Sequence, residues 1–173
     1  MFKRLLTGKL VILPVLFVAI LFIAGQADAQ TKVSGKLTLA YSNMDTLVVG
    51  DAEGHNIAMA ESKGTNASAG ETTFMDGAEV TNISFADLTM GSGPHEGYVT
   101  FKSGNDMTIA KWTGMVTTVM SAEGAPQTSF SGTFQYLKGA GQYANIKGGG
   151  TYEGHFTSNT EYVSDWKGEY TLK

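Results

Sequence analysis

The last third of the chain alternates aromatic and polar residues in a regular pattern. Residues 130–136, 151–157 and 162–172 each place an aromatic or small residue at nearly every second position, with mostly polar residues between them. Successive side chains of a β-strand point to opposite faces, so each run predicts a strand with one aromatic and one polar face. We expect the aromatic faces to share one core, formed by Phe130, Phe134, Tyr152, Phe156, Trp166 and Tyr170.

The same period of two continues upstream in shorter runs. Further strands are expected at residues 33–41, 45–50, 57–63, 79–88, 97–102 and 107–121. Within them, Leu47, Val48 and Val49 predict a short buried run. Residues 63–70 are rich in small and polar residues and predict a mobile loop. Residues 90–95 combine glycine and proline and predict a turn.

The number and spacing of these runs indicate the fold class. About eight strands, turn signals every 8–15 residues or so and almost no helical period favour an all-β, closed eight-stranded antiparallel barrel. Glycines inside strands, such as Gly114 and Gly132, suit the bends of a small barrel. An open β-sandwich is the alternative, because the same pattern permits it.

The first 29 residues have the features of a signal peptide. Basic residues precede an apolar run at residues 10–24, and Ala27-Asp28-Ala29 has the small-x-small form of a cleavage site. We expect cleavage between Ala29 and Gln30, which leaves residues 30–173 as one domain in the periplasm or outside the cell. An uncleaved anchor helix is the alternative, although the run is shorter than the roughly 20 residues a span needs.

Composition narrows the partners. Without residues 1–29 the chain keeps nine lysines, no arginine and fifteen acidic residues, a net charge of about −6. Nucleic acids and anionic membranes select basic surfaces, so neither is expected as a partner. The chain has no cysteine, which suits a bacterial exported protein stabilised by its core alone.

A glycine-rich segment joins two of the aromatic runs. Gly139 and Gly141 allow a tight turn, and Tyr143 and Ile146 are spaced to plug one end of a barrel. Residues 148–150 are three glycines that lead into the next strand, with no phosphate-binding context around them.

Residues 131–154, which contain this segment, resemble the allene-oxide-cyclase and dirigent-like barrels, and they are similar to a group of uncharacterised exported bacterial proteins with the same ending. The resemblance covers about the last third of the chain. It implies an eight-stranded barrel with a largely apolar interior that assembles as a homodimer or homotrimer. It supplies no catalytic residue, because the cyclase's functional side chains have no counterpart here.

Few residues are candidates for metal binding, catalysis or polar contact with a ligand. The histidines are not paired at metal-ligand spacing and the methionines are scattered, so neither a metal nor a cofactor is expected. His95 is expected at a barrel mouth, where its neighbour Glu96 could orient it. Glu61 shares a face with Ile57 and Met59, and would have a raised pKa and mark a pocket if that face is interior. An exposed position at the strand end is the alternative for Glu61.

Three functions remain open. The aromatic face favours a non-catalytic exported barrel that binds a small apolar or aromatic ligand. A structural or envelope-interaction protein with a filled barrel is the second possibility, and an isomerase or cyclase, based on the resemblance alone, is the third. An interior cavity would favour the first and third, and a filled interior the second. The candidate ligand contacts are Glu61, His95, Trp112, Phe134, Tyr152 and Trp166.

Overall fold

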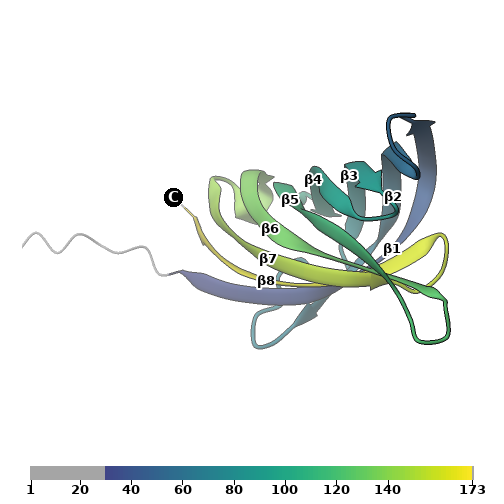
Figure 1. Cartoon of the computed structure of the whole chain (residues 1–173). Helices are drawn as coiled ribbons and strands as arrows, with labels where there is room; N and C mark the ends of the chain where they lie inside the picture. Colours follow the sequence, from purple (N-terminus) through teal and green to yellow (C-terminus); the bar gives the residue numbers. More distant parts are fainter. Residues whose placement is uncertain (1–29, 173) are drawn as a thin grey trace, which may run out of the picture.

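Eight β-strands account for most of residues 30–172, which are the residues described by the computed structural model (Figure 1). The strands are β1 (Thr31–Val48), β2 (His55–Ala69), β3 (Glu79–Thr89), β4 (Gly93–Ser103), β5 (Asp106–Met120), β6 (Pro126–Ala140), β7 (Ile146–Phe156) and β8 (Glu161–Leu172). A short 3-10 helix, η1 (Gly141–Tyr143), precedes β7. The predicted signal segment, residues 1–29, lies outside the described residues. No helix within the described part is long and apolar enough to span a bilayer.

Each strand pairs antiparallel with the next, and β8 pairs with β1 to close the barrel. The closing ladder extends from Thr31 opposite Tyr170 to Ala40 opposite Glu161. The predicted closed eight-stranded barrel is therefore confirmed, and the open sandwich is wrong. Closure pairs the outer strands that a sandwich would leave as edges.

The up-and-down path gives the barrel two different ends. The start of β1 and the end of β8 lie at one end together with the connections at residues 70–78, 104–105 and 141–145. We call this the closed end, because side chains fill it. The connections at residues 49–54, 90–92, 121–125 and 157–160 lie at the opposite end, which we call the open end. In Figure 1 the loop between β5 and β6 projects at this open end.

Phe74 is the central plug of the closed end. Its side chain is 1% exposed and meets a ring of aromatic side chains at centroid distances of 4.9–6.3 Å. These neighbours are Phe101, Tyr136, Tyr143, Trp166 and Tyr170. Asn66 holds the plug from β2, since its Nδ2 donates to the carbonyls of Phe74 at 3.1 Å and Met75 at 2.9 Å. Sequence patterns did not identify Phe74, because it lies outside every strand.

The glycine-rich segment at residues 139–150 forms the turn and the apolar plug that the sequence predicts. Tyr143 and Ile146 are buried at the closed end, so the prediction of an apolar plug there is confirmed. Gly141 begins η1 at φ +64°, and Gly148 adopts φ +127° in β7. Such positive φ values favour glycine, as the predicted turn requires.

Two predictions about the first strands are wrong. Leu47 and Val48 are 70% and 78% exposed, because this end of β1 extends past β8 and pairs only with β2. Residues 63–70 are not a mobile loop, since β2 continues to Ala69. The small residues there reflect a close approach of strands: a Cβ on Gly64 would lie 1.9 Å from the carbonyl oxygen of Thr38.

Candidate ligand-binding cavity

A cavity of about 980 Å³ occupies the barrel from its middle to the open end. All eight strands contribute side chains to its wall. The plug around Phe74 fills the other end, so the interior is divided into a filled half and a hollow half.

The wall of the cavity has a small-residue side and an aromatic side. Strands β2 and β3 present small side chains to the interior, from Ala58, Ala60, Ser84 and Ala86. Strands β5 to β8 present large rings, from Trp112, Phe130, Phe134, Tyr152, Phe156 and Tyr162. The alanine and serine side chains are too short to reach the aromatic rings on the other side of the barrel. The space left between the two sides is the cavity.

The small side was not recognisable from the sequence. Met59 and Ile83, which alternate with these small residues, point outward and are 59% and 51% exposed. These large apolar side chains therefore lie on the outer face, opposite to the arrangement in β6 to β8, whereas Val80 and Leu88 at the two ends of β3 face inward. Alternation identified the two faces of each strand but not which one is interior.

The cavity wall carries no Asp, Glu, Lys or Arg side chain from the described residues. Its polar groups are hydroxyls, amides and imidazoles. A buried charge without a partner is costly, so such a wall suits a ligand whose enclosed part is uncharged.

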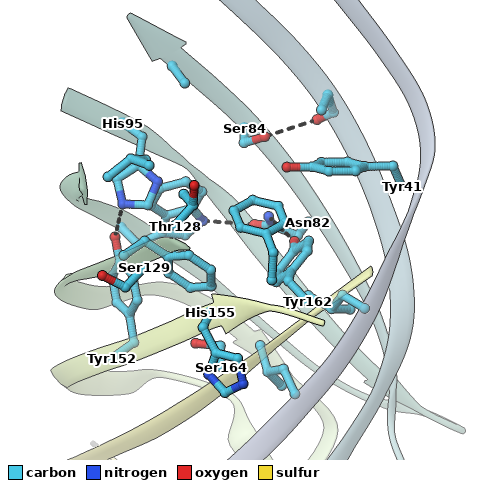
Figure 2. A pocket seen from close by; sticks show the side chains of 18 of the residues that line it. Tyr41, Asn82, Ser84, His95, Thr128, Ser129, Tyr152, His155, Tyr162 and Ser164 are labelled. Atoms are coloured by element: carbon cyan, nitrogen blue, oxygen red, sulfur yellow. Dashed lines mark hydrogen bonds between the residues drawn. The ribbon is translucent and has the colours of Figure 1, made fainter. Parts of the chain in front are cut away.

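His95 and Tyr152 form one polar pair of the wall. The Tyr152 hydroxyl lies 3.0 Å from Nε2 of His95, and a dashed line marks this hydrogen bond in Figure 2. Burial lowers the pKa of His95 to about 4, partly offset by a hydrogen bond with the backbone of Ser131. A neutral imidazole that donates to Ser131 keeps a lone pair on Nε2, which accepts the Tyr152 hydrogen. Burial also raises the pKa of Tyr152 above its ordinary value.

The predicted surroundings of His95 need correction. His95 does not lie in a turn at the mouth: β4 begins at Gly93, and the imidazole points into the cavity. Glu96 does not orient it, because neighbouring residues of a strand face opposite sides. The Glu96 carboxylate lies outside, with its Oε2 3.2 Å from Nζ of Lys111.

A second polar chain crosses the middle of the barrel. Nε1 of Trp112 donates to Oδ1 of Asn82 at 2.8 Å, and Nδ2 of Asn82 donates to the Tyr162 hydroxyl at 3.0 Å. These residues line the cavity, and Figure 2 shows Asn82 next to Tyr162. These hydrogen bonds satisfy the buried amide of Asn82 and the indole N–H of Trp112, so they fix the positions of the Trp112 and Tyr162 rings.

Tyr41 adds a hydroxyl on the β1 side. In Figure 2 its ring points from β1 into the cavity. Burial raises the pKa of Tyr41 to about 12, with a further contribution from nearby Tyr162. Tyr41 is therefore a neutral hydroxyl at any physiological pH and can contribute a hydrogen bond to a ligand.

Five of the six candidate ligand contacts line this cavity: His95, Trp112, Phe134, Tyr152 and Trp166. Glu61 does not. It points outward from β2, where Lys63 Nζ lies 2.9 Å from Oε1 and the Ser42 hydroxyl donates to the same oxygen at 2.9 Å. These hydrogen bonds, first that of Lys63 and then that of Ser42, lower the pKa of Glu61; its face is the outer one, as the alternative of an exposed position predicts, so the condition for a raised pKa is not met.

The three histidines do not converge. His95 is in the cavity, and His155 is exposed at its rim. His55 lies at the open end, where its Nε2 is 2.6 Å from Oδ1 of Asp87 and its Nδ1 bonds Asp51. The bond to Asp87, followed by that to Asp51, raises the pKa of His55. Residues 30–172 contain no group of three or more acidic, histidine or cysteine side chains placed to hold a metal.

No protein family matches this chain, and no curated protein matches it. The closed eight-stranded barrel is thus shown by the structure, whereas the likeness to allene-oxide-cyclase and dirigent-like barrels remains a resemblance.

Proposed function

We propose that this protein is an exported binding protein that encloses a small apolar or aromatic ligand in the open half of its barrel. The observation that carries the proposal is the cavity of about 980 Å³, walled by aromatic rings and free of charged side chains from the described residues. Apolar cavities with a few placed polar groups are the usual form of small-molecule sites.

The cavity supports this proposal over a filled structural barrel. Small eight-stranded barrels can fill their interior with side chains. Here Ala58, Ala60 and Ala86 occupy positions where larger residues would close the space. Stability needs no such hollow, since the plug around Phe74 already provides a packed core.

The polar groups support binding over acid–base catalysis. His95 is neutral near pH 7, because burial lowers its pKa to about 4. Its partner Tyr152 has a raised pKa and also stays neutral. A general acid or base works best with a pKa near the operating pH. The pair therefore suits hydrogen bonding to a ligand better than proton transfer.

The direct test is native mass spectrometry of protein purified from its own host, which should show a bound small molecule. The second test is titration with N-phenyl-1-naphthylamine, a neutral aromatic probe whose fluorescence rises in apolar sites. Saturable binding supports the proposal. Failure of the probe to bind, together with no co-purified molecule, would overturn it.

A matched pair of variants locates the site. Ala60→Trp should fill the cavity and abolish probe binding, because Ala60 faces the interior. Met59→Trp adds a similar ring one residue away on the outer face and should leave binding unchanged. Circular dichroism of both variants verifies that the barrel is intact.

A further inference from the structure

The open end of the barrel is acidic. Its connections contain Asp51, Glu53 and Glu123, and the adjoining strand ends carry Asp45, Asp87 and Glu161 on the outer face, next to the inward-facing Met44, Leu88 and Tyr162. Among the described residues, none of these carboxylates forms an ion pair with a lysine. His55 bonds Asp51 and Asp87 and compensates only that part of the charge.

Lysines are distributed in the opposite way. None of the eight described lysines lines the cavity or lies in an open-end connection. Three of them are ion-paired on the outer surface: Lys36 with Asp165 at 3.4 Å, Lys63 with Glu61 at 2.9 Å, and Lys111 with Glu96 at 3.2 Å. The barrel thus has a mouth of negative potential above an uncharged cavity.

An apolar lining connects the cavity to this acidic mouth. The cavity wall next to the open end is lined by Met44 on β1, Leu88 on β3, Val119 on β5 and Pro126 on β6. A ligand with its body in the cavity would extend past these side chains toward the carboxylates of the open-end connections. Its outer end would then lie in a region of negative potential that is still partly shielded from water.

We propose that the preferred ligands are cationic amphiphiles, with an apolar or aromatic body inside the barrel and an amine or similar positive group at the mouth. This inference rests on the proposed function, since it assigns the ligand class of the same cavity. Carboxylate ligands of the same shape should bind more weakly. An anion finds no arginine or lysine in the wall or the open-end connections, and it meets like charges there.

The test uses three compounds with one ring system: 2-naphthalenemethanol, 2-naphthylmethylamine and 2-naphthoate. Calorimetric titration at pH 7 and low salt should give the tightest binding for the amine, intermediate binding for the alcohol and the weakest for the carboxylate. We expect about a tenfold ratio between amine and carboxylate, and added NaCl should reduce it because salt screens exposed charges.

The alcohol separates the two proposals. If none of the three compounds binds, the proposed function itself is overturned. If the alcohol binds and the amine and carboxylate bind equally well, the cavity function stands and the inference about the cationic group is overturned.

Variants locate the selectivity at the mouth. Glu53→Gln with Glu123→Gln removes two open-end charges that do not contact His55, and should lower the amine-to-carboxylate ratio while leaving alcohol binding unchanged. Glu71→Gln with Glu79→Gln makes the same change in net charge at the closed end and should leave the ratio as it is. An equal effect of both pairs would show that net charge, not the mouth, sets the preference, and would overturn the inference.

Discussion

The Tyr152 hydroxyl reaches His95 across two intervening strands. Tyr152 is on β7 and His95 on β4, yet their Oη and Nε2 atoms are 3.0 Å apart. Gly114 on β5 and Gly132 on β6 are paired opposite each other between them. A Cβ on either glycine would lie 2.5 Å from the Tyr152 hydroxyl. The two glycines therefore provide the space in which the tyrosine lies.

Gly132→Ala should displace Tyr152 and destabilise the barrel. The new Cβ would lie 2.1 Å from the carbonyl oxygen of Thr113, so backbone and ring must both shift. We expect a loss of about 1–3 kcal/mol of unfolding free energy, as is usual for overpacking. Urea unfolding measures it, and Ser131→Ala on the outer face is the control. Equal stability of the two variants would contradict the close approach described here.

The low pKa of His95 predicts acid sensitivity. The pKa is about 4 in the folded protein and 6.5 in an ordinary histidine, so the unfolded chain takes up this proton first. The free energy of unfolding should therefore fall as the pH drops from about 6.5 to 4, and the His95 contribution should level off below that.

The contribution of His95 is isolated by comparison with His95→Asn. His55 has a raised pKa and changes stability in the opposite sense, but it is common to both proteins. The difference between wild type and variant should change across pH 4–6.5 and stay constant above it. A difference that is the same at pH 4.5 and pH 7 would show that His95 titrates normally.

Trp166→Ala should be strongly destabilising. The ring is buried against Phe74, Phe101 and Phe134, and its Nε1 donates to Oδ1 of Asn66 at 3.0 Å. Truncation leaves a cavity and an unsatisfied amide, with an expected cost of about 3–5 kcal/mol. Thermal melting measures it. Tyr98→Ala, on the outer face of β4, is the control and should melt close to wild type.

Gly141→Ala tests whether the glycine segment is structural. Gly141 has φ +64°, and a Cβ there would lie 2.1 Å from Oδ1 of Asp106. We expect a loss of about 1–2 kcal/mol without any change in nucleotide or anion binding. Paired melting and titration with ATP would detect the opposite pattern, in which binding is lost and the melting temperature is kept.

Export should remove residues 1–29. The basic start, the apolar run and Ala27-Asp28-Ala29 motivate this prediction. Intact-mass measurement of protein from the periplasm or medium should give a chain that begins at Gln30. Material that still contains Met1 would show that the segment is kept as an anchor.

The fold could be predicted because its strongest signal is repeated. In β6 to β8 the interior face carries aromatic residues and the outer face mostly polar ones, so alternation alone assigns both. Phe134, Tyr152 and Trp166 were found in this way, and Trp112 was found from the alternation of β5. The strand count is compatible with the closing ladder between β1 and β8, since the first and last of an even number of antiparallel strands can pair antiparallel, but the same count permits an open sandwich.

The rest of the site depends on relationships between distant residues. Ala60 gives no signal of its own beside Met59 and Glu61, and its interior position follows only from barrel closure. Asn66 and Asn82 look like loop or surface residues in sequence. Their burial is stabilised by partners 100 and 30 residues away, Trp166 and Trp112. Local patterns carry no information about such pairs.

The pairing of β1 with β8 also has a consequence for biogenesis. Thr31 is opposite Tyr170, so the barrel closes only when the last strand has been made and pairs with the first. Such non-local contacts slow folding. A ribosome-bound or truncated chain that lacks β8 would expose the free edges of β1 and β7, which other chains can pair with. Premature termination would therefore yield chains prone to aggregation and proteolysis.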